Sequence, residues 1–284
     1  RVVAHALENL IRDSNKVMVM GHTNPDIDSM GSSLGVYRLA KSLGKNAYII
    51  DSDENNTLQT FKNALLKDPE YEDILITKEV AEENIDKDTL LVVVDTHKIN
   101  YVEAPELLNK TEKIVVIDHH RRSTDYIENA ILIFQEVYAS SASELVTELI
   151  QYAETRVDLK MIETESLYAG IMMDTKNFTF KTGVRTFEAA AFLRKKGIDI
   201  IRVKKWFQSD LETFNKIAEI VTNAEIVNES IAIAIYDKKE KDASLICAKA
   251  ADELLTISNI TASFVIGNQG NKVCISGRSI GDVN

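Results

Sequence analysis

Strand-length apolar runs alternate with amphipathic segments of helical length through the first two-thirds of the chain. This alternation is typical of a largely parallel sheet covered by helices, because parallel strands need a crossover segment between them. The β-branched continuity of the runs indicates strands that are buried on both faces. The expected strands are Val17–Met20, Ala47–Ile50, Ile74–Ile76, Leu90–Val94 and Ile114–Ile117. The expected helices include Ser29–Leu43, Ser141–Ala153, Ile162–Met173 and Arg185–Lys196.

A second, smaller pattern follows. It comprises an apolar run, a helix and a turn-rich hairpin: Ser230–Tyr236, Ala243–Leu255, and Ala262–Ile266 with Val273–Ser276. With 284 residues the chain is long enough for two domains. We predict an α/β domain with a mostly parallel sheet at 1–196, a helical connector at 197–222 and a smaller α+β domain at 223–284. The charged segment Asp237–Asp242 is expected to be a solvated turn.

Composition restricts the classes of function. Hydrophobic residues make up 45% and charged residues 27% of the chain, as in ordinary globular proteins. The net charge of −11 disfavours a surface that coats bulk nucleic acid. Two separated cysteines, Cys247 and Cys274, fit a reducing compartment. No run approaches the roughly 20 apolar residues of a membrane span, so we expect a soluble chain without membrane contact, and its ends suggest a fragment.

Polar residues follow the first expected strand. His22, Asp26 and Asp28 lie in the segment GHTNPDID, and small residues then open the next helix. Ligands of open α/β sheets gather beyond the carboxyl ends of the strands, so a site is expected here. An Asx-Pro turn with helix-capping aspartates explains this segment about equally well.

Two later strands end in similar residues. Asp95, Thr96 and His97 follow LLVVV, and Asp118, His119 and His120 follow IVVI. Asp95 alone would more often be a helix cap. Capping does not explain all the clusters together, because four of the five histidines fall within them. Asp174 ends an apolar helix, where a carboxylate opposes the helix dipole unless a cation is nearby; alone, it is better interpreted as an exposed helix-terminal residue.

Carboxylates and imidazoles without a nearby cysteine suit a harder divalent ion such as manganese better than a closed zinc–thiolate site. Magnesium, iron and cobalt remain alternatives. Two such ions would be balanced by four aspartates and two neutral histidines, leaving a formally neutral cluster that attracts phosphate. Ions about 3.5–4 Å apart would acidify a water between them and stabilise both oxygens of an in-line displacement. The pattern therefore predicts two-metal phosphoester hydrolysis.

The segments HTNPDID, VVVDT, IDHH and GIMMDT, in this order, resemble the DHH phosphoesterase superfamily, and SGRS resembles its DHHA1 substrate-binding domain. The stretches DHHRRSTDYIENA, YASSASELVTELI and DTKNFTFKTGVRTFEAAAFLRKKG are similar to those of the GdpP-type cyclic-di-AMP phosphodiesterases. The resemblance covers nearly the whole chain. It implies manganese-dependent hydrolysis of cyclic di-AMP to linear pApA.

The resemblance also implies roles for individual residues. One manganese would be bound by His22, Asp26 and Asp95, and the other by Asp28, Asp95, His119 and Asp174. Asp118 would not bind metal itself but would fix the tautomer or orientation of a histidine. His120 would lie near the scissile phosphate. Asp95, Asp118 and His120 would then be the catalytic residues. Substrate would be held by Arg278 and Ser279 of SGRS, with Asn284 taking part. An exposed, solvated arginine in a hairpin explains Arg278 equally well without the resemblance.

The family resemblance further implies a cytoplasmic catalytic part whose longer parent is anchored in the cell membrane, and it allows a homodimer. Family members continue into a glycine-rich segment that this chain does not reach. Rival functions are hydrolysis of short oligoribonucleotides, phosphoadenosine phosphate or pyrophosphate, and nucleotide sensing without turnover. SGRS and the lack of a lysine-rich substrate motif argue against pyrophosphate.

Overall fold

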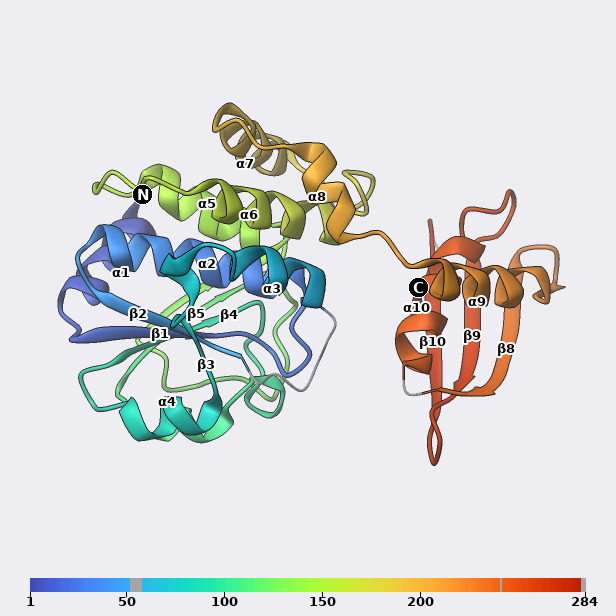
Figure 1. The fold of residues 1–284 in the computed structure, drawn as a ribbon, viewed down its shortest axis with the longest axis horizontal. Helices are drawn as coiled ribbons and strands as arrows, with labels where there is room; N and C mark the ends of the chain where they lie inside the picture. The colour runs from blue at the N-terminus through green and yellow to red at the C-terminus, as the bar shows by residue number, and fades with distance from the viewer. Residues whose placement is uncertain (52–57, 241, 282–284) are drawn as a thin grey trace. The chain divides into compact units, whose positions relative to one another are not determined.

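The computed structural model describes residues 1–51, 58–240 and 242–281. These residues form two compact units, Arg1–Trp206 and Phe207–Asn284 (Figure 1). The division falls within 197–222, the segment predicted to be a helical connector. Its two helices belong to different units, α8 (Ile200–Trp206) to the first and α9 (Leu211–Thr222) to the second.

The first unit contains a six-stranded sheet in the order β3-β2-β1-β4-β5-β6. Every neighbouring pair is parallel. The chain therefore winds outward in both directions from β1 and β4, and the switch point between them is where such sheets bind ligands. The strands are β1 (Lys16–Met20), β2 (Asn46–Ile50), β3 (Leu75–Ile76), β4 (Leu90–Val94), β5 (Lys113–Asp118) and β6 (Leu132–Gln135).

The α/β class and the parallel sheet are confirmed, and all five predicted strands are present. Ile74 lies outside β3, which is only two residues long. The sequence prediction missed β6, a short edge strand with mixed exposure.

Helices cover both faces of this sheet. Alternate residues of β1 point to opposite sides, so Val17 and Val19 join one core while Met18 and Met20 join the other. The helices α1, α2, α5 and α6 lie on the first side and α4 on the second (Figure 1). Their bounds, with those of α3 and α7, are α1 (Val2–Arg12), α2 (Ile27–Ser42), α3 (Gln59–Leu65), α4 (Lys78–Asn84), α5 (Ala142–Tyr152), α6 (Met161–Asp174) and α7 (Val184–Lys195).

Helices α2 and α6 approach closely because glycine occurs at their contact. A Cβ at Gly31 would lie 2.5 Å from the carbonyl oxygen of Ser166. A Cβ at Gly170 would lie 2.6 Å from Oδ1 of Asp28. Real Cβ atoms do not approach so closely, so both glycines are needed for this packing, and Gly170 also leaves room for a buried carboxylate.

The second unit is α+β. Its sheet has the order β10-β9-β8-β7, with β8 and β9 parallel and the outer pairs antiparallel. Helices α9 and α10 contribute Ile220 and Leu254 to a core on one face of this sheet. The predicted helix and terminal hairpin are present. The remaining elements are β7 (Glu225–Val227), β8 (Ile231–Lys239), α10 (Ala243–Leu254), β9 (Ala262–Asn268) and β10 (Val273–Ser279).

One prediction in this unit is wrong in part. The start of Asp237–Asp242, expected to be a turn, continues β8 to Lys239. Beyond an irregularity after Tyr236, Lys239 pairs with Asn268, so the strand persists although these residues are charged and exposed.

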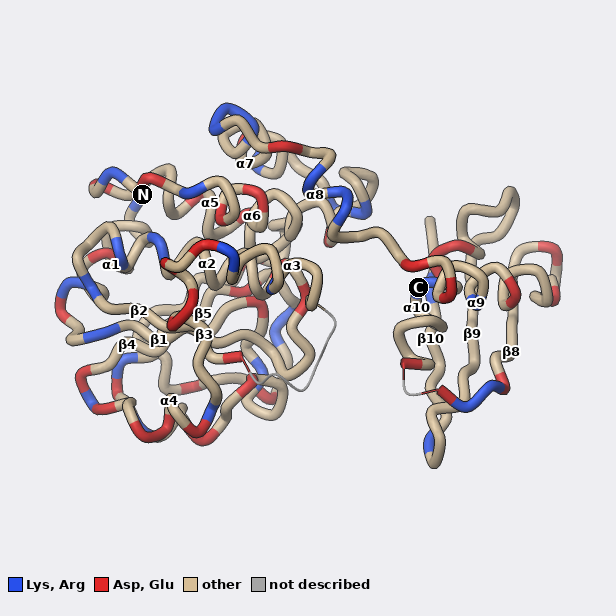
Figure 2. The backbone as a smooth tube through the Cα atoms, in the orientation of Figure 1, with Lys and Arg blue, Asp and Glu red and all other residues tan. Residues whose placement is uncertain are grey.

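Figure 2 shows acidic and basic residues interspersed along both units, in keeping with the net charge of −11. Among the described residues, the helices are too short or too polar to span a bilayer.

Candidate metal centre

The chain between β1 and α2 supplies the first three polar side chains. Asp26 caps α2, because its Oδ1 accepts the backbone N–H groups of Asp28 and Ser29 at 2.9 and 3.0 Å. The capping explanation considered for this segment therefore holds for Asp26. Its carboxylate nevertheless also lies 4.0 Å from Nε2 of His22, so capping and a place in the site are combined in one residue.

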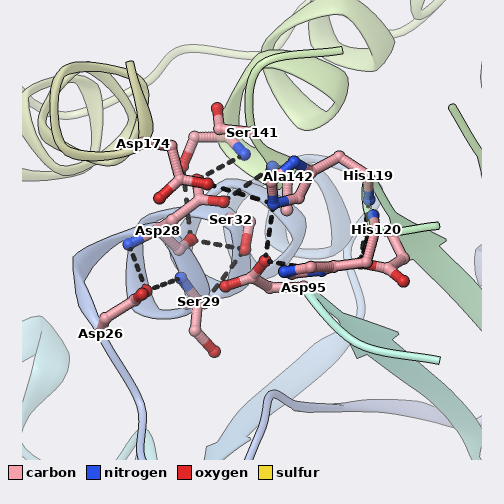
Figure 3. A network of polar contacts seen from close by, with 12 residues as sticks. Asp26, Asp28, Ser29, Ser32, Asp95, His119, His120, Ser141, Ala142 and Asp174 are labelled. Carbon is pink, nitrogen blue, oxygen red and sulfur yellow. Dashed lines mark hydrogen bonds and ion pairs between the residues drawn. The ribbon is translucent and has the colours of Figure 1, made fainter. Parts of the chain in front are cut away.

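Asp28 lies in the first turn of α2 and is fully buried. Its Oδ2 accepts the backbone N–H of Ala142 at 2.7 Å, and its Oδ1 accepts that of Ser143 at 2.8 Å (Figure 3). These donors form the start of α5, where the helix dipole favours a negative charge. The N-terminus of α5, which follows the last strand of the sheet, thus holds a carboxylate from α2, which follows the first strand.

Asp95 follows β4 in a left-handed backbone conformation with φ of 59°. Its backbone N–H still donates to the carbonyl of Ile117 at 2.9 Å, so the chain turns immediately beyond the ladder with β5. Aspartate tolerates this conformation better than most residues, but it is strained, and such strain gathers at functional sites. The turn directs the carboxylate toward two imidazoles: Asp95 Oδ2 lies 3.4 Å from His22 Nε2, and Asp95 Oδ1 lies 3.3 Å from His119 Nε2.

Asp118 is the last residue of β5 and is fully buried. Its Oδ1 accepts the backbone N–H groups of His119 and His120 and lies 2.7 Å from Nδ1 of His120. Its Oδ2 lies 2.5 Å from Nδ1 of His97. Both carboxylate oxygens of Asp118 are therefore occupied within the protein.

His97 connects the two strand exits. Its Nε2 accepts the backbone N–H of Ser123 at 2.9 Å, so its Nδ1 carries the proton and donates to Asp118. Gln135 lies beside this pair and donates to the carbonyl of His120 at 2.8 Å. The two hydrogen bonds of the His97 ring, from Ser123 and to Asp118, fix the Asp118 carboxylate. Asp118 in turn orients the ring of His120.

Asp174 ends α6, as the sequence predicts, and its side chain is 22% exposed. Its Oδ2 lies 3.1 Å from Nε2 of His119, which places it beside the negative end of its own helix and near three other aspartates. The structure thus brings all six predicted ligand residues into one cluster (Figure 3 shows five of them with His120).

Three overlapping groups in this cluster could hold a metal ion, with their ligand atoms within 4.8 Å of one another. Asp95 belongs to two of them, and so does His119. The groups are His22, Asp26 and Asp95; Asp28, His119 and Asp174; and Asp95, His119 and His120.

The donor atoms fit a metal because several have no other partner. Asp95 Oδ1 and His119 Nε2, which lie 3.3 Å apart, are both buried without a hydrogen bond to any described residue. The contacts between Nε2 of His119 and its two carboxylates are short but lack hydrogen-bond geometry, as expected of atoms facing a common point. Buried polar atoms are rarely left unsatisfied, so the cluster calls for cations.

The ionisation of the cluster also indicates a site for cations. Burial and the charges of Asp95 and Asp174 raise the pKa of Asp26 to about 6 and that of Asp28 well above its usual value. Burial opposes charge on His119, but Asp174 and Asp95 outweigh it and raise its pKa to about 11. Without a cation the cluster retains protons; an ion would replace them.

Asp118 behaves differently. Burial would raise the pKa of its carboxyl, but hydrogen bonds from His120 and His97 outweigh that effect and hold the pKa at about 2. Asp118 therefore remains ionised and hydrogen-bonded.

A cavity of about 230 Å³ opens beside the cluster. Its lining combines carboxylates and imidazoles of the cluster with Lys98 and Tyr101 from the segment after β4. The ring of Tyr101 stacks on His22, with centroids 5.4 Å apart. This space is suited to an anionic group at the metal-competent atoms.

The predicted substrate residues belong to the second unit. Arg278 and Ser279 lie at the end of β10, and Nε of Arg278 donates to Oδ1 of Asp252 at 3.0 Å. Arg278 is therefore ion-paired rather than simply solvated. Asn284 lies outside the described residues.

The sequence analysis counted His97 among the histidines at the strand exits but assigned it no role, and it did not include Lys98 or Tyr101. The DTHK run after β4 carried a usable signal, since residues that directly follow a strand at a switch point line the crevice. The contact between the N-terminus of α5 and Asp28 could not be predicted from the sequence, because these backbone N–H groups meet the carboxylate only in the folded chain.

A family model described as the DHH family, N-terminal domain, matches residues 16–173. The chain belongs to the DHH family. The match contains five of the six residues of the cluster, and the sixth, Asp174, directly follows its end.

Named relatives match over the whole chain. It is 41% identical to the cyclic-di-AMP phosphodiesterase GdpP of Bacillus subtilis and 42% identical to the cyclic-di-AMP phosphodiesterase PdeA of Listeria monocytogenes. Each alignment covers 100% of this chain and 44% of the relative, so the chain spans less than half the length of these proteins.

Two more distant proteins are also similar to this chain. A bifunctional oligoribonuclease and PAP phosphatase NrnA of Mycoplasma genitalium is 29% identical over 68% of this chain and 57% of its own length. The crystal structure of an exopolyphosphatase-related protein from Bacteroides fragilis matches with a TM-score of 0.83 at 22% identity, covering 97% of this chain and 84% of that one. The latter supports the fold alone.

Proposed function

We propose that this protein hydrolyses cyclic di-AMP to linear pApA with two divalent metal ions, manganese being the expected metal. The observation that carries the proposal is the cluster of four aspartates and two histidines at the switch point of a DHH-family sheet. The choice of substrate follows the relatives that match the whole chain.

We assign His22, Asp26 and Asp95 to one ion. Asp28, Asp95, His119 and Asp174 are assigned to the other, with Asp95 as the bridge. The central position of Asp95, with its two oxygens near different imidazoles, supports this assignment. Two bound ions supply an acidified water and neutralise charge on the attacked phosphate.

The remaining residues orient the reaction. Asp118 holds His120 through Nδ1, which leaves Nε2 as the ring nitrogen available to the phosphate. The His120 side chain is half exposed and lines the cavity, in keeping with contact to the substrate. In this proposal Nε2 of His120 lies against the scissile phosphate, while His97 keeps Asp118 in place.

The substrate half of the proposal concerns the second unit. We assign Arg278 and Ser279, with Asn284, to the nucleotide, as in a DHHA1-type domain. A guanidinium suits bidentate phosphate contact. The ion pair with Asp252 fixes Arg278 through Nε, and its Nη1 donates to the carbonyl of Gly277.

The direct test is incubation of the purified chain with manganese and cyclic di-AMP, with detection of pApA by mass spectrometry. We expect pApA and no signal after chelation. Asp28→Asn should abolish turnover while cyclic di-AMP binding, measured by calorimetry, survives in part; a nucleotide sensor without turnover would give no product with either protein. Cleavage of short RNA with no pApA would contradict the proposal.

The second candidate is hydrolysis of short oligoribonucleotides or phosphoadenosine phosphate, favoured by the likeness to the Mycoplasma protein. A comparison of kcat/KM for pApA, a short RNA and cyclic di-AMP decides between the two. We also propose that the catalytic part operates in the cytoplasm as part of a longer membrane-anchored protein and pairs as a homodimer. Fractionation of the parent protein and sedimentation of the chain test these two points.

A further inference from the structure

The loop after β4 carries a cation beside the cluster. Lys98 lines the cavity together with Asp26, Asp95 and Asp174 and is the only lysine or arginine among its lining residues as described. Its ammonium group makes no hydrogen bond or ion pair in the described part of the chain, and its side chain is exposed. A lysine beside three carboxylates that pairs with none of them is available to an anion from outside.

The backbone around Lys98 is fixed, so its position is not that of a free surface loop. The N–H of Lys98 donates to Oγ1 of Thr96 at 3.3 Å, and the N–H of Tyr101 donates to the carbonyl of Lys98 at 3.0 Å. The N–H of Thr23 donates to the carbonyl of Tyr101 at 2.9 Å, and Val102 bridges to His22. The loop is thus tied to the segment that carries the metal-competent residues.

The substrate of the proposed function has two phosphodiester groups in one ring. A single turnover cleaves only one of them. The cluster and His120 provide for the reacting phosphate. The other remains anionic and needs a cation in the same cavity, because burying an unpaired charge is costly. Lys98 fits that role because its ammonium group is unpaired in the described part of the chain, and because it lines the cavity without belonging to a metal-competent group.

We propose that Lys98 binds the second, non-reacting phosphate of the cyclic dinucleotide and so selects a substrate with two phosphates over one with a single phosphate. This inference rests on the proposed function. Lysine is a flexible point charge and suits a phosphate whose position differs between substrate and product.

The test compares Lys98→Met with the unmodified chain on cyclic di-AMP and on bis-p-nitrophenyl phosphate, a diester with only one phosphate. Loss of one charge-assisted contact should lower kcat/KM for cyclic di-AMP about 10- to 100-fold, mainly through KM. The single-phosphate diester should be cleaved at an unchanged rate. Lys98→Arg should restore most of the loss because it keeps the charge.

Lys87→Met is the matched control. Lys87 precedes β4 while Lys98 follows it, so the same charge is removed at the opposite end of one strand. This variant should behave as the unmodified chain on both diesters. An equal loss on both diesters in Lys98→Met, or no loss on either, would overturn the inference.

Failure of the proposed function looks different. An unmodified chain that cleaves the single-phosphate diester but not cyclic di-AMP would overturn that function. Calorimetric binding of cyclic di-AMP, with calcium in place of manganese, still tests Lys98 in that case. Equal affinity of Lys98→Met and the unmodified chain would overturn the inference, and an affinity about 10- to 100-fold weaker would support it.

Discussion

The neighbouring strands β4 and β5 lead into similar segments, since an aspartate directly follows β4 and another ends β5, each with a histidine within two residues. The two aspartates are nevertheless used in opposite ways. Asp118 remains in extended strand backbone and accepts hydrogen bonds on both oxygens. Asp95 turns away from the end of β4 with a positive φ and keeps a buried oxygen that has no hydrogen bond to any described residue. The difference shows that a carboxylate becomes a candidate metal ligand when its neighbours leave its lone pairs free.

His97 makes the two exits interdependent. It follows Asp95 in sequence, but its ring serves Asp118, and the bond from Ser123 determines which of its nitrogens donates. The segment after β4 thus supplies the metal-competent oxygen of Asp95 and, two residues later, the His97 ring that hydrogen-bonds to Asp118 at the end of β5.

The largest expected effect comes from Asp95→Ala. Removing the shared carboxylate should lower kcat for cyclic di-AMP by about 1000-fold or more, since the charge stabilisation supplied by the ions amounts to several kcal/mol. Metal content measured by mass spectrometry should fall with it. A variant that keeps two ions per chain and more than a tenth of the activity would contradict the bridging assignment.

Asp118→Asn should have a smaller effect and lower activity or metal affinity about 10- to 100-fold, as is typical of residues that hydrogen-bond to metal ligands and orient them. The amide keeps only one accepting oxygen and so cannot accept from both His97 and His120, which weakens the fixed orientation of the His120 ring. The expected signature is a lower kcat with two ions still bound at saturating manganese. Loss of both ions would place Asp118 among the direct ligands and remove its contrast with Asp95.

The pH dependence of metal binding follows from His119. Its pKa, raised to about 11, lies above the ordinary value, so the metal-free protein holds this proton up to alkaline pH. A metal needs the neutral ring. Metal affinity should therefore rise about tenfold per pH unit between pH 7 and 9, with release of a proton.

Calorimetry in buffers of different ionisation enthalpy counts the protons released. His119→Gln should lose this dependence, whereas His5→Gln, in α1 and outside the cluster, should keep it. Metal affinity that is independent of pH over this range would contradict the assignment of His119.

The smallest expected effect on activity is that of His97→Leu. It removes the donor to Asp118 and leaves the N–H of Ser123 without its acceptor, which should destabilise the fold by about 1–3 kcal/mol. Activity should fall less than tenfold, because His120 and two backbone N–H groups still hold Asp118. Thermal unfolding and kcat measure the two effects. A greater loss of activity than in Asp118→Asn would show that His97 acts on the substrate itself.

The sequence predicted the strands and their polar exits because buried parallel strands have continuous apolar runs. It missed β6, since a short edge strand with exposed residues lacks such a run. It identified the residues of the cluster but not their bonding. Asp28 meets Ala142 across 114 positions of sequence, a contact that no local pattern encodes. Asp95 and Asp118 have similar local sequences, and only the folded neighbours distinguish their roles.

The central claim is that the Asp95 carboxylate joins two metal ions. Electron paramagnetic resonance during a manganese titration of the metal-free chain tests it most directly, because two manganese ions that share a ligand are magnetically coupled. We predict that two equivalents produce a coupled multiline signal in the unmodified chain, and that Asp95→Ala shows isolated ions only. Uncoupled manganese at two bound equivalents in the unmodified chain would contradict the claim.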